Sequence, residues 1–351
     1  MLRQLFIDEW IEEKSLPILD VRSPSEFNHG HITGAISLPL FSDEHRALIG
    51  TTYKQSGKSD AMIQALEIAG PKMAELVKLA GIAAPDKKFR IHCWRGGMRS
   101  GSVAWLLNTM GFEEVYVLHK GYKAYRHWVL AKFDATFSLH ILGGKTGSAK
   151  TEILKQMARQ DEAIIDLEGL AHHKGSAFGW IGQPDQPTQE QFENDLATAL
   201  YTHQTREMIW LEDESERIGL SRIPLAMFKQ MRSAPIYFLD IPKTIRIPYL
   251  VNSYAREGDE KLELSILRIT KKLGGANTKL ALQALQRKDY EQVADLVLYY
   301  YDKSYETGLG MRDPSRVIRI QSETIDPVIN AQLILQHKSK TRHGTHQTHP
   351  V

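Results

Sequence analysis

Residues 137–151 read Phe137-Ser138-Leu139-His140-Ile141-Leu142-Gly143-Gly144-Lys145-Thr146-Gly147-Ser148-Ala149-Lys150-Thr151. Residues 137–142 form a short apolar run typical of a strand, and a helical pattern begins at Glu152, directly after the glycine-rich run. A strand, a glycine-rich loop and a helix in this order are the context that a Walker A phosphate loop requires. We therefore predict that an α/β domain begins near residue 136 and holds phosphate groups in this loop.

The phosphate loop contains candidate ligands at a fixed spacing. These are Gly144, Gly147, Ser148, Lys150 and Thr151. In such loops backbone N–H groups surround the phosphates and the lysine contacts their oxygens, while the hydroxyl, here that of Thr151, can reach Mg²⁺. Ala149 stands where glycine normally precedes the lysine. The donors suit a nucleotide and a diphosphate ester equally, so the loop alone does not identify its ligand.

Strand and helix patterns alternate after the phosphate loop. Apolar strand candidates lie at residues 163–167, 208–211, 235–239 and 317–320, and the pattern between 243 and 307 is helical. This alternation predicts a doubly wound parallel sheet with a helical extension over residues 136–336. Residues 337–351 are polar and basic without a repeating pattern, and we expect them to form a disordered tail.

A similar alternation precedes the phosphate loop. Apolar runs at residues 16–21, 89–92 and 115–118 are separated by helical patterns. The spacing predicts a smaller α/β domain with a parallel sheet over residues 1–135. The fold class is therefore α/β in both parts of the chain.

Cys93 is the only cysteine among 351 residues, and it lies in Cys93-Trp94-Arg95-Gly96-Gly97-Met98-Arg99-Ser100. A loop between a strand and a helix directs backbone N–H groups and the helix dipole toward one point, which stabilises a thiolate. Arg95 and Arg99 would lower the pKa of the thiol further, so we interpret Cys93 as a nucleophile. The alternative is a buried structural thiol. A single cysteine excludes a disulfide or a cysteine-rich zinc site within the chain.

Acidic residues follow two predicted strands of the phosphate-binding domain. Asp166 and Glu168 follow one strand, and the run Glu212-Asp213-Glu214 follows another. Carboxylates at strand ends can complete a phosphate and Mg²⁺ site, so Asp166, Glu168, Glu212 and Asp213 are candidate supporting acids. Each could equally be a helix N-cap or a solvated loop acid.

The net charge of +2 conceals two oppositely charged segments. Residues 152–216 carry 14 acidic and 4 basic residues, whereas residues 229–288 carry 12 basic and 5 acidic residues. The second segment could face a polyanion, although basic runs on helices are often only solvated surface. The sequence has no apolar run long enough to span a membrane and no signal-peptide pattern, so we expect a cytoplasmic protein without a membrane partner.

Several motifs resemble those of known protein families. Residues 20–27 and 30–39, the Cys93 loop and residues 117–125 resemble the motifs of rhodanese domains. A rhodanese domain joined directly to a phosphate-loop domain resembles the tRNA 2-selenouridine synthases. Residues 166–171, 175–179, 210–215 and 217–219 also match that family, and the resemblance covers residues 5 to 325.

The resemblance implies that the chain replaces the sulfur of wobble 2-thiouridine in tRNA with selenium. Geranyl diphosphate would first alkylate the sulfur at the phosphate loop. Selenophosphate would then supply selenium, which Cys93 would hold as a selanyl adduct, with Arg95 and Arg99 stabilising the anion. The apolar cleft for the geranyl chain has the candidates Phe178, Trp180 and Trp210. Another enzyme could supply the selenophosphate.

The resemblance also implies that the chain binds the anticodon loop of a tRNA, where unstacked bases are accessible. The basic segment 229–288 is the candidate surface for this RNA. Its candidate residues, which we expect to be exposed on helices, are Arg246, Arg256, Arg268, Lys271 and Lys272.

Two other functions fit the same motifs. A rhodanese sulfurtransferase coupled to an ATP-dependent, kinase-like domain could pass sulfur to a small acceptor. A rhodanese fold without catalysis could dock a partner, although the presence of Cys93 argues against that function. The selenouridine synthase and the sulfurtransferase can be distinguished by their ligands. Geranyl diphosphate should stabilise the phosphate-loop domain of the first, and ATP that of the second.

Overall fold

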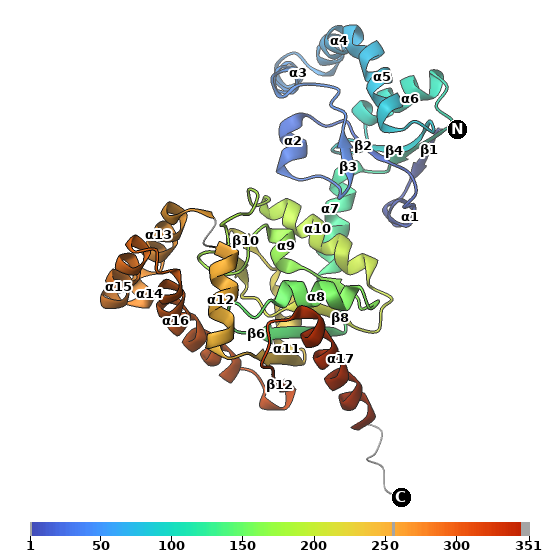
Figure 1. The fold of residues 1–351 in the computed structure, drawn as a ribbon. Helices are drawn as coiled ribbons and strands as arrows, with labels where there is room; N and C mark the ends of the chain where they lie inside the picture. The colour runs from blue at the N-terminus through green and yellow to red at the C-terminus, as the bar shows by residue number, and fades with distance from the viewer. Residues whose placement is uncertain (1, 255–256, 345–351) are drawn as a thin grey trace, which may run out of the picture. The chain divides into compact units, whose positions relative to one another are not determined.

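The computed structural model describes residues 2–254 and 257–344, and the chain divides into two compact units (Figure 1). Unit 1 comprises Met1–Lys132 and Glu193–Thr198, and unit 2 comprises Phe133–Phe192 and Ala199–Val351. Each unit contains a parallel sheet with helices packed against it, which confirms the predicted α/β class.

The sheet of unit 1 has five parallel strands in the order β1-β5-β4-β2-β3. The strands are β1 (Leu2–Leu5), β2 (Ile18–Asp20), β3 (Ala35–Ser37), β4 (Lys88–His92) and β5 (Glu114–Leu118). The helices are α1 (Ile7–Glu12), α2 (Pro24–His29), α3 (Asp43–Gln55), α4 (Lys58–Ala69), α5 (Met73–Ala83), α6 (Met98–Thr109) and α7 (Gly121–Lys132), with a 3₁₀ turn at Gly70–Lys72. Strands β2 and β4 pair with Asp20 opposite His92, so the loops after these strands leave the same edge of the sheet.

The sheet of unit 2 has five parallel strands in the order β12-β11-β6-β8-β7. They are β6 (Leu139–Gly144), β7 (Ile164–Ile165), β8 (Ile209–Glu212), β11 (Ile236–Asp240) and β12 (Val317–Gln321), and β9 (Arg217–Ile218) pairs separately with β10 (Ser221–Arg222). The first helices are α8 (Lys150–Ala158), α9 (Leu167–Ala171) and α11 (Leu225–Ser233), together with the two ends of α10 (Gln189–Thr202), whose residues Glu193–Thr198 belong to unit 1. Strand β6 lies between β8 and β11, so the strands that follow β6 are added first on one side of it and then on the other. Open α/β sheets bind ligands at such a point, where the strand order reverses.

A helical extension follows β11, as predicted. It consists of α12 (Lys243–Tyr254), α13 (Asp259–Arg268), α14 (Thr270–Leu273), α15 (Gly275–Gln286) and α16 (Tyr290–Gly310), and a 3₁₀ turn at Pro314–Arg316 leads into β12. In Figure 1, α13, α14 and α15 lie together beside α16. Helices α13 to α16 share a core of their own, which includes Ile266, Ala281 and Val297 and also Phe178 from the loop after α9.

Two expectations about secondary structure need correction. Strand β7 ends at Ile165, because the Asp166 side chain accepts a hydrogen bond from Gly169 N (2.6 Å) and caps α9. Helix α17 (Pro327–Gly344) continues past residue 337, so a disordered tail is wrong for residues 337–344. Lys338 of this helix makes an ion pair of 2.5 Å with Glu162. Residues 345–351 lie outside the described part of the chain.

Candidate active sites

Cys93 lies between the end of β4 and the start of α6, as the sequence predicts. The residue is 3% exposed, and the hydroxyl of Ser100, in the first turn of α6, lies 3.2 Å from its Sγ atom. Burial raises the pKa of the Cys93 thiol, but the hydrogen bonds from Ser100 and the charge of Arg99 outweigh burial and lower the pKa below its usual value. The site therefore favours a thiolate, the form in which cysteine is a nucleophile.

The start of α7 holds the Cys93 loop in place. Tyr122 N donates to the carbonyl of Cys93 (2.8 Å), and Lys123 N donates to the carbonyl of Trp94 (3.0 Å). A Cβ atom on Gly121 would stand 2.3 Å from the carbonyl oxygen of Cys93. Gly121 also has a φ of 58°, so only glycine allows this approach. Gly121 was not a candidate from the sequence, although residues 117–125 resemble a rhodanese motif.

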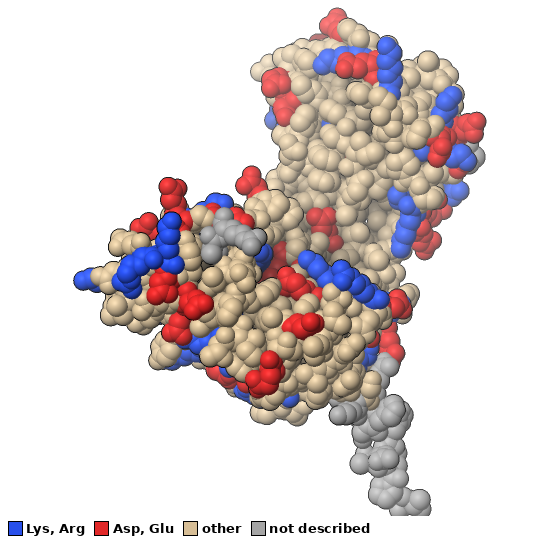
Figure 2. Space-filling model, viewed as in Figure 1, with Lys and Arg blue, Asp and Glu red and all other residues tan. Residues whose placement is uncertain are grey.

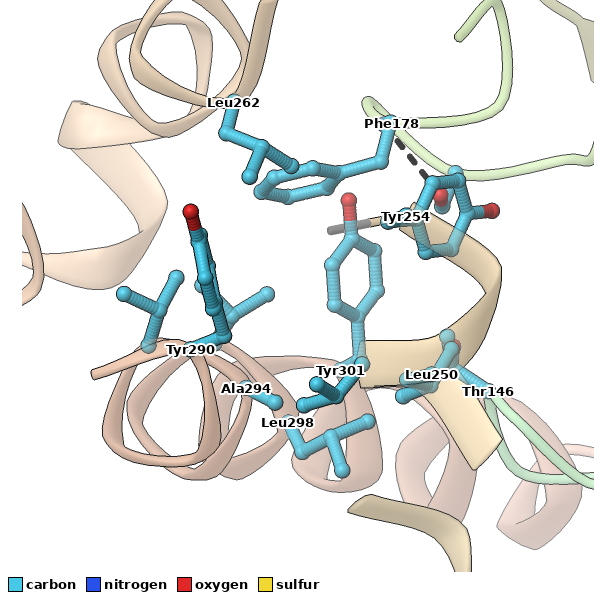
Figure 3. A pocket seen from close by; sticks show the side chains of 13 residues that line it. Thr146, Phe178, Leu250, Tyr254, Leu262, Tyr290, Ala294, Leu298 and Tyr301 are labelled. Carbon is cyan, nitrogen blue, oxygen red and sulfur yellow. Dashed lines mark hydrogen bonds between the residues drawn. The ribbon is translucent and has the colours of Figure 1, made fainter. Parts of the chain in front are cut away.

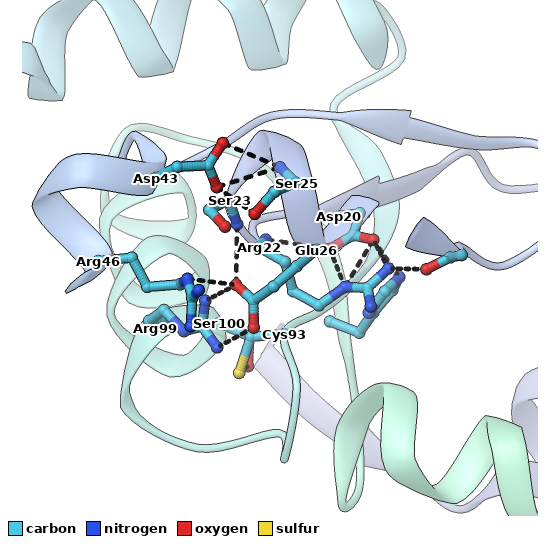
Figure 4. Close-up of polar contacts among 12 residues, drawn as sticks. Asp20, Arg22, Ser23, Ser25, Glu26, Asp43, Arg46, Cys93, Arg99 and Ser100 are labelled. Carbon is cyan, nitrogen blue, oxygen red and sulfur yellow. Dashed lines mark hydrogen bonds and ion pairs between the residues drawn. The ribbon is translucent and has the colours of Figure 1, made fainter. Parts of the chain in front are cut away.

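The two arginines of the loop differ in their surroundings. Arg99 donates to both carboxylate oxygens of Glu26, at 2.7 and 3.2 Å, so it is already paired with a carboxylate (Figure 4). Arg46 lies 3.9 Å from the same carboxylate. Arg95 is exposed, and it lowers the pKa of Cys93 through its backbone N–H rather than its side chain. Neither Glu26 nor Arg46 was a candidate from the sequence.

The motif at residues 20–22 supports the same site from inside unit 1. Arg22 is 1% exposed and donates to the carboxylate of Asp20, at 2.6 Å for the closest pair. Its guanidinium carbon lies 3.8 Å from the ring centroid of Tyr122. Asn194, from the segment Glu193–Thr198, donates to the hydroxyl of Tyr122 (2.8 Å). Tyr122, whose backbone holds Cys93, is therefore fixed at one ring face and at its hydroxyl group.

Replacing Ser100 by alanine should raise the pKa of Cys93, because Ser100 contributes the largest interaction that favours the thiolate. A hydrogen bond to a charged group contributes about 1.5–3 kcal/mol, or about one to two pKa units. Alkylation of the thiol by iodoacetamide, measured against pH, gives the midpoint. Ser102→Ala, at an exposed serine of the same helix, is the control. Equal midpoints in the two variants would exclude the role given to Ser100.

The second site surrounds the phosphate loop of unit 2, in a cleft of about 700 Å³. Gly144 ends β6, Gly147 and Ser148 line the cleft, and α8 begins at Lys150. Ala149 directly precedes this helix and has a φ of 55°. The alanine that stands in place of glycine therefore still adopts the left-handed conformation that glycine favours. The loop thus has the strand, turn and helix that the sequence predicts.

Lys150 is the central cation of this cleft. Its Nζ atom lies 3.2 Å from the carbonyl oxygen of Gly144 and 3.3 Å from the hydroxyl of Tyr305. Burial lowers the pKa of Lys150, but Tyr305 and the carboxylates of Glu168 and Glu214 outweigh burial and raise the pKa. Lys150 is therefore charged and ready to bind an anion.

Of the candidate acids, Glu168 is the one that touches the phosphate loop. Its carboxylate accepts a hydrogen bond from the hydroxyl of Thr151 (3.1 Å). A hydroxyl and a carboxylate are oxygen ligands that Mg²⁺ accepts, and Mg²⁺ usually takes its remaining ligands from phosphates and water. The described residues contain no group of three or more His, Cys, Asp or Glu side chains that could hold a metal by themselves. The donor set thus fits an ion that binds together with a phosphate ligand.

The other candidate acids have structural partners. Asp166 caps α9, as the alternative interpretation proposed. Glu212 is fully buried and accepts a hydrogen bond from Leu167 N (3.0 Å), and Asp213 pairs with Arg312 (2.5 Å). Asp166 and Asp213 also line the cleft, as does the third member of this run, Glu214. Strict alternation along an extended segment would place only one of the neighbours Asp213 and Glu214 there, but the chain turns after β8 ends at Glu212.

An apolar pocket adjoins the phosphate-loop cleft (Figure 3). Five residues line both spaces: Thr146, Ser176, Leu250, Tyr254 and Tyr301. Phe178, Val251, Leu262 and residues of α16, among them Tyr290, Ala294 and Leu298, complete the pocket. The hydroxyl of Tyr290 donates to Asp259 (2.9 Å) and that of Tyr301 accepts from Ala177 N (2.9 Å), so both hydroxyls already have partners in the protein.

The three aromatic candidates for an apolar cleft lie in different parts of unit 2. Phe178 lines the pocket. Trp180 packs against the helical core, and its indole N–H donates to Ser265 (3.1 Å). Trp210 is fully buried in strand β8, within the core of the sheet, so its assignment to a ligand cleft is wrong.

The candidate RNA-binding residues also differ from one another in their exposure to solvent. Arg246 is 1% exposed, because its guanidinium pairs with Asp302 (2.7 Å) and donates to the carbonyl of Thr146 (2.8 Å). The expectation that Arg246 is exposed is therefore wrong. Arg256 lies outside the described residues. Figure 2 shows basic side chains on the helices α13–α15 together with acidic ones, and the exposed candidates there are Arg268, Lys271 and Lys272.

Comparison with known proteins gives matches in both units. The family model described as the tRNA 2-selenouridine synthase AAA domain matches residues 137–335, and the model of the rhodanese-like domain matches residues 6–127. None of the described helices is long and apolar enough to cross a membrane.

Several curated relatives bear the name tRNA 2-selenouridine synthase. The chain is 38% identical to that of Shewanella piezotolerans, over 74% of this chain and 76% of the relative. Identity to that of Shewanella sediminis is 36%, over 86% and 90% of the two chains. Identity to that of Serratia proteamaculans is 31%, over 90% and 91%.

Proposed function

The chain belongs to the tRNA 2-selenouridine synthase family, and from this membership we propose that it exchanges the sulfur of wobble 2-thiouridine in tRNA for selenium in two steps. In the first step, the sulfur is alkylated with the geranyl group of geranyl diphosphate at the phosphate loop. In the second step, selenium from selenophosphate displaces the geranyl thiolate, and this step depends on Cys93.

The observation that carries the first step is the apolar pocket that opens beside the phosphate loop. An allylic diphosphate has a charged end and an apolar end, and the two spaces offer one surface for each. Thr146 and Leu250, which line both, lie where the two ends of such a molecule would join. A polar nucleoside would gain little from the apolar pocket.

The chemistry of geranyl transfer matches the charges of the cleft. As the bond from carbon to the diphosphate oxygen breaks, negative charge grows on the departing diphosphate. The ammonium of Lys150 and the backbone N–H groups of the loop stabilise this charge. Thr151 and Glu168 would hold Mg²⁺, which would supply further positive charge at the diphosphate.

The second step requires an S-alkylated base. A thione sulfur is a poor leaving group, whereas the S-geranyl group leaves as a thiolate after selenium adds to the ring carbon. The selenide-level selenium of selenophosphate forms the new bond to the ring carbon, and water takes the phosphoryl group as phosphate. Cys93, with its lowered pKa, is the nucleophilic side chain of unit 1 on which this step depends. The exposed Arg268, Lys271 and Lys272 are the described candidates for contact with tRNA phosphates.

Filling the apolar pocket tests the first step. Ala294→Trp should weaken the binding of geranyl diphosphate about 50-fold, because displacing about three CH₂ groups from the pocket costs about 2.4 kcal/mol. The affinity for inorganic diphosphate should stay the same, since Ala294 lines only the apolar pocket. Isothermal titration calorimetry measures both values.

Ala276→Trp is the control, because it adds the same bulk at an exposed position of α15. Equal losses for geranyl diphosphate in the two tryptophan variants would exclude the pocket as the isoprenoid site. If wild-type protein binds ATP and not geranyl diphosphate, the sulfurtransferase coupled to a kinase-like domain becomes the better assignment.

A further inference from the structure

Two exposed lysines that line the phosphate-loop cleft lie over aromatic rings. The Nζ atom of Lys174 is 5.4 Å from the ring centroid of Tyr254, and that of Lys272 is 5.9 Å from the ring centroid of Tyr300. Both tyrosines line the cleft as well. A ring attracts a cation but carries no net charge, so it positions the ammonium group without neutralising it. The charge of each lysine is therefore available to an anion.

Carboxylates lie close to other cations of the same cleft. Lys155 is 4.0 Å from Asp166, and Arg232 is 3.8 Å from Asp213. Within residues 2–254 and 257–344, no carboxylate forms an ion pair with either of the two lysines that lie over rings. The cleft thus offers positive charge outside the phosphate loop that no acidic side chain of these residues neutralises.

Arg268 extends this surface beyond the cleft. It is exposed at the end of α13, and its guanidinium carbon lies 5.0 Å from the ring centroid of Trp180. Burial and the charge of Arg268 lower the pKa of His173, so Arg268 lies near the residue that precedes Lys174. Lys272 follows Arg268 by four residues, in the short helix α14. Cations and aromatic rings thus alternate from the end of α13 to the edge of the cleft.

A surface on which cations alternate with aromatic rings suits single-stranded nucleic acid. The cations bind the phosphates, and the rings present faces on which bases stack. The loop after α9 and the helical extension meet at this surface, because Ala177 N donates to the hydroxyl of Tyr301 (2.9 Å). The cleft of about 700 Å³ has room for a nucleoside beside a diphosphate, since pockets for whole small-molecule ligands measure about 300–1,000 Å³. A strand bound along this edge would therefore place one nucleoside at the cleft.

We propose that Lys174 and Lys272 bind phosphates of the single-stranded anticodon loop, so that the target nucleotide enters the phosphate-loop cleft where the loop after α9 meets α14 and α16. Arg268 binds the same strand further from the cleft. This inference rests on the proposed function and names the edge of the cleft by which the tRNA enters. It adds Lys174, which was not a candidate from the sequence.

The test measures how tightly the full chain binds a stem-loop RNA with the anticodon loop of a 2-thiouridine tRNA, by fluorescence anisotropy at several KCl concentrations. Each phosphate contact of a single strand contributes about 0.7 to the slope of log K against log salt concentration. Lys174→Met and Lys272→Met should therefore each reduce the slope by about 0.7 and weaken binding about fivefold at about 0.1 M salt, and the double variant about 25-fold. Lys303→Met, at an exposed lysine of α16 that does not line the cleft, is the control and should match wild-type protein.

The affinity for inorganic diphosphate should stay the same in these variants, since Lys150 and the N–H groups of the phosphate loop are its proposed site. Three results would each overturn the inference. An RNA affinity and a salt slope equal to those of wild-type protein would place the RNA elsewhere. An equal loss in Lys303→Met would show that any positive charge of unit 2 has the same effect. A loss of diphosphate affinity as large as the loss of RNA affinity would show that the two lysines serve the diphosphate instead.

The proposed function fails separately, when wild-type protein forms no S-geranyl nucleoside from this RNA and geranyl diphosphate. The RNA affinities of the variants remain interpretable in that case, because they are measured without geranyl transfer.

Discussion

Lys150→Met should reduce the proposed geranyl transfer by at least about 1,000-fold. The ammonium of Lys150 is the central cation of the phosphate loop, within 3.3 Å of both Gly144 and Tyr305, and no step in which diphosphate departs can do without positive charge there. Losing a single donor to a developing anion typically costs about 100–1,000-fold, and a full charge costs more. Methionine keeps the length of the side chain, so the apolar contacts of α8 are preserved.

Release of diphosphate and formation of the S-geranyl nucleoside measure this effect. Arg159→Met is the control, because it removes an exposed cation at the end of the same helix. Equal melting temperatures for Lys150→Met and Arg159→Met would show that the loss is catalytic. Geranyl transfer at the wild-type rate in Lys150→Met would place the diphosphate elsewhere in the protein.

Cys93→Ser should stop the formation of 2-selenouridine and leave the S-geranyl nucleoside as the end product. Serine has nearly the same size and can keep the hydrogen bond with Ser100. Its hydroxyl does not ionise near neutral pH, so the variant lacks the nucleophile. Because Cys93 is the single cysteine, the variant also contains no other thiol that could take over.

The matched assay supplies 2-thiouridine tRNA, geranyl diphosphate and selenophosphate, and the digested nucleosides are identified by mass. Accumulation of the S-geranyl nucleoside in the variant serves as an internal control, since it shows that the protein is folded and binds tRNA. Selenouridine at the wild-type level in Cys93→Ser would exclude Cys93 as the nucleophile.

The fold and the positions of the two loops could be predicted from the sequence because local signals determine them. Strand, loop and helix follow one another within residues 88–109 and 139–158, so short-range patterns were sufficient. The single cysteine and the Walker-like run then indicated a candidate nucleophile and a candidate set of phosphate ligands.

Long-range contacts could not be predicted in the same way. Arg246 belongs to a basic segment, and only the packing of α12 against α16 reveals that its charge is neutralised by Asp302. Asn194 lies far along the chain from Tyr122, yet it completes unit 1. The order Glu212-Asp213-Glu214 likewise gives no indication that the third acid faces the ligand cleft.

The buried guanidinium of Arg246 links the phosphate loop to a position 156 residues further along the chain, because it holds both the carbonyl of Thr146 and the carboxylate of Asp302. Removing Asp302 leaves the buried guanidinium of Arg246 without its counter-charge, at a cost of about 3–5 kcal/mol, and removing Arg246 leaves the partly buried carboxylate of Asp302 without its partner. Residues 246 and 302 are therefore free to change during evolution only as a pair. Distant members of the family that have lost one of these charges should have lost both.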